Sequence, residues 1–576
     1  MNGRRPDLCK NPRMPRGLTA AIASILAAVL VSACSGSIDP RQAANPGTTG
    51  RDFRAATKNW RDAACALPKS WLVRIKRGHW RGRGPDINLA PHNGNPFGGF
   101  PVATTHSGPW PFLQRVPLVF YGPGFIAPRG EIALDREVTL ADIAPTLAEL
   151  LGTGAPDMAT GRPIVEALVP KRDRSPNLRL IVTVVWDGGG RNVLERWGDS
   201  LPFLRSLIAN GTSISNATVG TSPSVTPAVH ATIGTGAFPE RHGIVNILQR
   251  EDGVMVAGLG GSGPSSLEIP TLADTYDAET ENVAKVGLVA KDAMHFPMLG
   301  HGSYLSGGDA DIAVLLSRDI EGPLLGTLGS WYTLPAYLDE LNPRYAKAAR
   351  KIDADDGKID GAWMGHDLPD DPYVERGFNR TPALTLFQTE ASKTILEREG
   401  FGEDDVPDLF FTNYKEPDYI GHTYNYYSEE VGRTLEYADE ALHELVQFLE
   451  RNVGEKRWAL VLTADHGQSP LPEEAGTWPI RADNVESLIT EFVGAGENGV
   501  VQHIKQNGVW LDRDVLEKKG VTLVDVSKFV LGLRIRDDAV GRDFPERYRD
   551  RFDEPLFDAA FPRAEIPRLI RCAGGS

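Results

Sequence analysis

Three separated apolar runs limit the folds open to this chain. Residues 178–186 (LRLIVTVVW), 408–414 (DLFFTNY) and 458–464 (WALVLTA) are rich in β-branched and aromatic side chains. Continuous runs of this kind are typical of strands buried on both faces, as in a parallel sheet covered by helices. Between the last two runs, residues 435–449 repeat Leu or Ala at helical spacing on one face. The pattern predicts an α/β fold with a mostly parallel sheet between helices.

Other stretches continue the pattern or interrupt it. Residues 116–122 (VPLVFYG) predict a strand, and 142–152 (DIAPTLAELLG) predict a helix. Residues 500–512 (VVQHIKQNGVWLD) predict a hairpin around Asn507-Gly508. Residues 303–400 are rich in Gly, Asp and Pro and break the strand–helix alternation, so we expect an insertion that caps the site.

The N-terminus has the composition of a targeting segment. Basic residues precede the apolar run of residues 18–33, which is too short for a transmembrane helix. The run ends in LVSAC, which resembles a bacterial lipoprotein signal. We expect a signal peptide over 1–33, a lipidated Cys34 and a tether over 34–60, giving an exported lipoprotein at the outer face of the cell membrane or in the periplasm. An ordinary cleaved signal with an incidental cysteine is the alternative.

Each of the three apolar runs is followed by a carboxylate: Asp187, Asp418 and Asp465. Ligands of open α/β sheets bind beyond the carboxyl ends of the strands, where three acids would repel one another unless a cation lay between them. His422, four residues after Asp418, would point the same way on a helix, and His466 adds a second imidazole. Mixed imidazole and carboxylate donors suit zinc. Taken singly, each aspartate could equally be a helix cap or turn residue.

Residues 221–244 (TSPSVTPAVHATIGTGAFPERHGI) contain a candidate nucleophile. A Ser/Thr-rich turn leads into a helix predicted to begin near Thr226, and a helix N-terminus favours an anion. A zinc ion beside Thr226 would lower the pKa of its hydroxyl and make it a nucleophile at neutral pH. The alternative is that Thr226 only caps the helix.

The motifs WDGGG, TPAVHATIGTGAFPERHGI, DYIGH and TADHG, in this order, resemble the alkaline phosphatase superfamily, and most of all its nucleotide pyrophosphatase/phosphodiesterase branch. The resemblance implies an alkaline-phosphatase-like fold, two zinc ions and a Thr or Ser nucleophile. Another divalent ion could replace zinc. Carried over by motif, the ligands of one zinc are Asp187, Thr226, Asp465 and His466. Those of the other are Asp418, His422 and a histidine that the family supplies late in its chain.

That last histidine is out of place in this sequence. Only His503 follows His466, and it lies in the predicted hairpin. The family's surroundings for this ligand occur instead at residues 105–124 (THSGPWPFLQRVPLVFYGPG), which makes His106 the expected sixth ligand. The resemblance therefore implies a circularly permuted chain: 61–170 is the C-terminal part of the catalytic domain, 175–302 its core, 303–400 the cap and 401–576 the core continued. Cys65 and Cys572 would flank the new termini, and we expect a disulfide between them as a hypothesis.

Phosphate recognition departs from the family pattern. Asn246 of HGIVNI lies one position out of register with the family's phosphoryl-binding Asn, and Lys291 lacks the Arg that follows two residues later in some monoesterases. Lys291 could still contact phosphate as a point charge. The other histidines of the core are expected to be structural: His230, His242, His295 and His301.

These features predict an exported di-zinc enzyme that hydrolyses phosphodiester or nucleotide pyrophosphate bonds of small substrates through a phosphothreonine. An alkaline-type phosphomonoesterase is the alternative, followed by an inactive binding lipoprotein. The net charge of −15 argues against general nucleic-acid binding. It does not exclude an anionic substrate, because bound metal ions reverse the local field.

Overall fold

The three apolar runs form neighbouring parallel strands, β15 (Asp408–Tyr414), β6 (Leu180–Trp186) and β16 (Trp458–Thr463). Every residue of these strands is buried. They lie within an eight-stranded sheet of order β12-β11-β15-β6-β16-β3-β7-β4. The remaining strands are β12 (Ile312–Leu315), β11 (Val286–Ala290), β3 (Leu118–Tyr121), β7 (Thr212–Ile214) and β4 (Gly130–Ile132). The sheet is parallel from β12 to β16, which confirms the predicted fold class.

The computed structural model describes residues 59–98, 105–258, 263–316, 329–368, 381–496, 499–542 and 546–573. The predicted signal peptide, the lipidation site Cys34 and residues 34–58 of the predicted tether lie outside these ranges. None of the helices within them is long and apolar enough to span a membrane.

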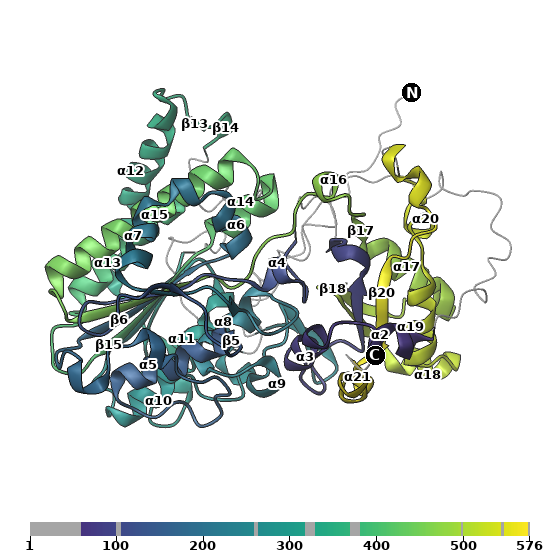
Figure 1. Cartoon of the computed structure of the whole chain (residues 1–576), viewed down its shortest axis with the longest axis horizontal. Coiled ribbons are helices and arrows are strands. Elements are labelled where there is room, and N and C mark those ends of the chain that lie inside the picture. Colours follow the sequence, from purple (N-terminus) through teal and green to yellow (C-terminus); the bar gives the residue numbers. More distant parts are fainter. Residues whose placement is uncertain are drawn as a thin grey trace, which may run out of the picture. The chain divides into compact units, whose positions relative to one another are not determined.

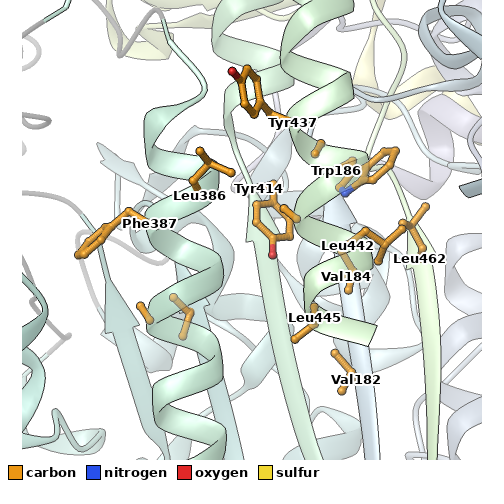
Figure 2. Packing of buried hydrophobic residues seen from close by; sticks show 14 of the residues in the cluster. Val182, Val184, Trp186, Leu386, Phe387, Tyr414, Tyr437, Leu442, Leu445 and Leu462 are labelled. Carbon is orange, nitrogen blue, oxygen red and sulfur yellow. The ribbon is translucent and has the colours of Figure 1, made fainter. Parts of the chain in front are cut away.

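Helices cover both faces of the large sheet because alternate side chains of its strands point to opposite sides. On β6, Val182, Val184 and Trp186 pack into one core, whereas Ile181 and Val185 pack into the other. Figure 2 shows the first core, where Leu442 and Leu445 approach the β6 side chains. Helices of this face include α7 (Pro202–Asn210), α13 (Ala383–Arg398) and α15 (Glu429–Asn452); those of the other include α5 (Ile143–Leu151), α8 (Thr226–Thr235) and α10 (Leu272–Glu279) (Figure 1).

The N-terminal segment supplies a strand to the middle of this sheet. β3 lies between β16 and β7 and is antiparallel to both. All of its residues except Tyr121 are buried, which agrees with the apolar sequence LVFY. The strand ends the parallel run and brings residues 105–117, which precede it, toward the same part of the fold as the end of β16.

The predicted cap insertion over 303–400 is too long. β12 pairs with β11 in the large sheet, and α13 is buried against that sheet. Both therefore belong to the core. The error has a local cause, since β12 contributes only four residues inside a Gly- and Asp-rich segment and offers no clear alternation. Between them the structure describes α12 (Asn342–Asp353) and a short pair, β13 (Ala362–Trp363) and β14 (His366–Asp367).

A second sheet accounts for much of the region predicted as a continuation of the core, 401–576. Its order is β18-β19-β1-β20, with β18 (Val501–Lys505), β19 (Gly508–Leu511), β1 (Ile87–Pro91) and β20 (Phe557–Pro562). The β18–β19 hairpin confirms the prediction, but its loop is Gln506-Asn507, with φ of 47° and 60°, one residue earlier than expected. β1 pairs antiparallel with β20, so the two ends of the described chain share one sheet.

A disulfide joins the same two ends. Cys65, the last residue of α2 (Trp60–Cys65), is bonded to Cys572 of α21 (Ile566–Cys572), with Cα atoms 5.4 Å apart. Both helices pack in the core of the second sheet.

Candidate active site

The three aspartates meet at the carboxyl ends of the parallel strands. Asp187 directly follows β6, and Asp465 is separated from the end of β16 by Ala464. Asp418 lies in α14 (Glu416–Tyr424), after β15. All three are at most 2% exposed. Gly188 allows the approach: its N–H donates to Asp465 Oδ1 at 3.0 Å, and a Cβ there would lie 2.9 Å from the Asp418 Cα. A side chain at residue 188 would therefore push the carboxylates apart.

His106, Asp418 and His422 form one potential metal-binding group, with donor atoms within 4.8 Å of one another. His106 Nε2 lies 3.9 Å and His422 Nε2 lies 3.3 Å from Asp418 Oδ1. His106 Nδ1 donates to the carbonyl oxygen of Ser224 at 2.9 Å. This bond fixes the tautomer and leaves the Nε2 lone pair directed to the group, as second-sphere partners of metal-binding histidines do.

Asp187, Asp418 and His466 form a second group. His466 Nε2 lies 3.7 Å from Asp187 Oδ1 and 3.2 Å from Asp465 Oδ2. Asp418 Oδ1, Asp465 Oδ2 and His466 Nε2 are buried and have no hydrogen-bond partner. Leaving such atoms unsatisfied costs about 1–3 kcal/mol each. Bound cations would satisfy these atoms, so the donors of the two groups fit metal ions.

Thr226 lies beside these groups. It is the first residue of α8, is 2% exposed, and makes no side-chain cap to the helix. Its Oγ1 accepts a hydrogen bond from Lys415 Nζ at 3.1 Å. The capping alternative therefore does not describe this side chain, and its hydroxyl faces the charged groups instead.

Lys415 is a site residue that the sequence reasoning missed. Its Nζ lies 2.7 Å from Asp187 Oδ1 and 2.8 Å from Asp418 Oδ2, in addition to its bond with Thr226. Burial opposes the charge, but the two carboxylates outweigh it and hold the pKa of Lys415 well above its usual value. The ammonium therefore stays positive and contacts the candidate nucleophile. Only its place directly before the EPDYIGH motif could have indicated it.

His295 and Asn413 both contact Asp187 Oδ2, the oxygen that does not pair with Lys415. His295 Nε2 donates to Asp187 Oδ2 at 3.3 Å, and Asn413 Nδ2 donates to the same oxygen at 3.4 Å. His230 lies 2.8 Å from the Thr226 carbonyl oxygen through Nδ1 and 2.8 Å from Asn413 Oδ1 through Nε2. These contacts agree with supporting roles for the two histidines. His242 and His301 bond elsewhere, to Thr232 and Asp274.

The remaining predicted residues differ in their relation to the site. Lys291 Nζ lies 4.6 Å from the ring centre of Tyr419, whose ring is 5.2 Å from Lys415 Nζ, so both lysines face one aromatic side chain. Burial lowers the pKa of Lys291, with Glu416 and Asp292 opposing it. Asn246 Oδ1 accepts from Ile247 N within its own loop, and none of its described hydrogen bonds reaches Thr226. His503 lies on β18 against Trp510, outside the metal-binding groups of the described residues.

Sequence comparison identifies the family. The family model for type I phosphodiesterase / nucleotide pyrophosphatase matches residues 181–553. The chain belongs to this family. The matched range contains Thr226 and six of the residues brought together above, Asp187, Lys415, Asp418, His422, Asp465 and His466. It excludes His106 and β3.

Individual relatives agree with this placement in the type I phosphodiesterase / nucleotide pyrophosphatase family. A Myroides odoratus protein named calcium-transporting ATPase is 26% identical over 425 residues, 63% of this chain and 74% of the relative. Alkaline phosphatase PafA of Elizabethkingia meningoseptica is 22% identical over 419 residues, with the same coverage of 63% and 74%. The crystal structure of wild-type PafA superposes with a TM-score of 0.50 at 19% identity, covering 67% of this chain and 85% of that one, which shows a shared fold. The chain is thus a hydrolase of phosphoric esters in the alkaline phosphatase superfamily.

Proposed function

We propose that this enzyme is an exported phosphodiesterase or nucleotide pyrophosphatase that works with two zinc ions and a Thr226 nucleophile. The observation that carries the proposal is the convergence of three aspartates and three histidines beside the buried Thr226 hydroxyl. One zinc would be held by Asp187, Thr226, Asp465 and His466, and the other by Asp418, His422 and His106. When bound, the two ions neutralise the phosphoryl oxygens and lower the pKa of coordinated oxygens.

The protein's own groups position the reaction. Thr226 Oγ1 gives its proton to solvent and attacks phosphorus. The bond from phosphorus to the leaving oxygen breaks in line with the attack, and this oxygen takes a proton from solvent, giving a phosphothreonine and a free alcohol. Water then adds to phosphorus, and Thr226 Oγ1 leaves and regains a proton. Lys415 Nζ, 3.1 Å from Oγ1, stabilises the negative charge on this oxygen in both steps. His295 and Asn413 hold Asp187 in place.

Substrate choice depends on the cations that meet the phosphoryl group. Residue 293 is Ala, where an Arg two residues after Lys291 marks some monoesterases. A diester carries one negative charge fewer than a monoester, so loss of that Arg favours diesters. The similarity to alkaline phosphatase PafA supports phosphomonoesters as the second candidate.

Two rates test this proposal. Zinc-loaded protein lacking residues 1–34 is assayed with a nitrophenyl phosphodiester and with the matching monoester. Faster diester cleavage supports the phosphodiesterase, whereas faster monoester cleavage makes the enzyme a phosphatase built on the same site. Thr226→Ala should abolish both activities while the fold and most of the zinc are kept, since Asp187, Asp465 and His466 remain as ligands. Thr226→Ser should retain measurable turnover. Full turnover by Thr226→Ala would remove the residue from the mechanism.

We further propose that the chain is circularly permuted and anchored through a lipid on Cys34. Support for the permutation comes from the position of β3 inside the sheet, from a family match that begins only at residue 181, and from the disulfide between Cys65 and Cys572. The anchor rests on the LVSAC sequence alone.

A further inference from the structure

Three carboxylates gather at the edge of the large sheet opposite the active site. Asp277, Asp309 and Asp311 each place an oxygen within 4.8 Å of the others. Asp277 lies near the C-terminal end of α10, and the other two lie in the loop that enters β12. Because β12 runs parallel to β11, β15 and β6, this loop is at the amino ends of the strands. The cluster is therefore separate from the residues that follow the carboxyl ends.

The cluster is buried on one side and open on the other. Asp277 is 2% exposed and Asp311 is 5% exposed, whereas Asp309 is exposed to solvent. Asp277 Oδ1 is buried and has no hydrogen-bond partner. Within the described ranges no Lys, Arg or His forms an ion pair with any of the three carboxylates. An unpaired buried carboxylate oxygen beside two other acids leaves a place for a positive ligand.

Electrostatics agree with a missing positive charge. Burial, followed by repulsion from Asp309, raises the pKa of Asp277 to about 7. Burial and the Asp277 charge raise the pKa of Asp311 well above its usual range. The Asp277 and Asp311 side chains are hydrogen-bonded to each other, and a proton shared in this bond would relieve part of the repulsion. It would still leave Asp277 Oδ1 unsatisfied. A divalent cation would satisfy this oxygen and neutralise the charge of the cluster.

We propose that Asp277, Asp309 and Asp311 bind a calcium ion that ties α10 to the entrance of β12. Only carboxylate oxygens are offered, which suits a hard cation and not zinc. Calcium accepts irregular oxygen geometry and bidentate carboxylates, with water at its remaining positions on the solvent side near Asp309. Its role is structural, because it fastens the edge strand β12 to the helix that covers it.

Calcium binding is tested on the full chain that is first dialysed against EGTA, then freed of the chelator and reloaded with zinc. Equilibrium dialysis with calcium chloride should give one calcium per chain, and calcium at about 100 times its Kd should raise Tm by roughly 2–4 °C or more. Absence of both effects would overturn the proposal.

Variants locate the site and separate it from the alternatives. Asp309→Asn removes an exposed carboxylate, so the fold is kept; it should weaken calcium binding at least about tenfold. Asp311→Asn should abolish the Tm response. Glu281→Gln, an exposed acid just beyond α10, and Asp465→Asn in the active site should both keep the wild-type response. If calcium raises the Tm of Asp311→Asn as much as that of the wild type, the ion binds elsewhere and the proposed location is refuted. If calcium does not raise the Tm of the wild type, and Asp311→Asn is more stable than the wild type, the carboxylates share a proton instead of binding calcium.

Discussion

The imidazole rings of His106 and His466 stack face to face, with centroids 3.6 Å apart and planes within 3°. His106 comes from the N-terminal segment and His466 from the loop after β16, and each belongs to a different group of potential metal ligands. The stack makes the position of one ligand depend on the other. The two groups of potential metal ligands therefore form one structural unit, joined by His106, His466 and the shared Asp418.

Replacement of His106 tests its assignment as a ligand. We expect His106→Ala to lose about one of two zinc ions per chain, because Asp418 and His422 alone leave a metal site open. Inductively coupled plasma mass spectrometry on desalted protein measures the loss. His503→Ala is the matched control and should keep both ions; the opposite result would reject the permuted arrangement of ligands.

Lys415 should stabilise the metal-free protein. Lys415→Met leaves Asp187 and Asp418 buried without their cation, and we expect a loss of about 3 kcal/mol in the free energy of unfolding, measured with urea in the presence of a chelator. Zinc should reduce this difference in the free energy of unfolding between Lys415→Met and the wild type, since a bound cation again neutralises the carboxylates. Lys351→Met, which breaks an exposed pair with Glu440, should cost about 0–1 kcal/mol under both conditions. Equal losses in the two variants would mean that Lys415 does not serve as the internal cation.

His242 should make the fold sensitive to acid. Burial lowers the pKa of His242 from 6.5 to about 3, and its Nδ1 accepts a hydrogen bond from Ile244 N, which protonation would break. In the unfolded chain the same group gains a proton below 6.5. The free energy of unfolding therefore keeps the full contribution of neutral His242 above pH 6.5. Below this value it falls by about 1.4 kcal/mol per pH unit until the pH approaches 3.

Urea unfolding at pH 7 and pH 5 measures this effect. Relative to His242→Gln, the wild type should lose about 2 kcal/mol more on acidification. An equal loss of unfolding free energy in the two proteins would assign the acid sensitivity to other groups.

The disulfide should act on stability and not on catalysis. Replacing Cys65 and Cys572 by Ser removes a cross-link between residues 507 positions apart, and we expect a loss of about 2–4 kcal/mol, seen as a lower Tm. Zinc content and kcat should remain, because both cysteines pack in the core of the second sheet. A Tm equal to that of wild type would show that the strands β1 and β20 hold the ends together without the bond.

A rejoined chain tests whether the order of segments matters. The new chain starts at residue 175, runs to 573, and continues through a short linker into residues 59–170. The linker is feasible because Cys65 and Cys572 already lie close together. We expect the same zinc content and a kcat within about threefold of the parent, since the deletion of residues 171–174 removes only peripheral contacts such as the Arg174–Glu149 ion pair and leaves the candidate site unchanged. An insoluble or metal-free product would show that the present order is needed for folding.

The sequence predicted the strands whose burial is complete and failed where structure depends on distant partners. β6, β15 and β16 are apolar on both faces, so their composition alone indicates parallel strands. The pairing of β1 with β20 leaves no local sign, because neither INLAP nor FDAAFP specifies its partner. The cap was overestimated since the four residues of β12 are too few to show a pattern.

Predictions of site residues divided in the same way. Motif positions located His106, Asp418 and the residues around them, because ligand types recur in a fixed order. Lys415 has no such pattern, and its role follows only from the geometry that places Nζ between two carboxylates and Thr226. For Asn246 the motif was a poor guide. The residue lies one position out of register with the family motif, and its side chain accepts a hydrogen bond from the backbone of its own loop.

The pairing of β1 with β19 and β20 has a consequence for biosynthesis. β1 emerges from the ribosome early, while both strands that cover it are made near the end of the chain. His106 likewise waits for Asp418 and His422. A nascent chain therefore has an unpaired apolar strand until translation is almost finished, and its groups of candidate metal ligands stay incomplete until His466 is made. Any product of premature termination before β20 lacks part of the second sheet, and one that ends before Asp418 lacks a residue that both groups of candidate metal ligands share.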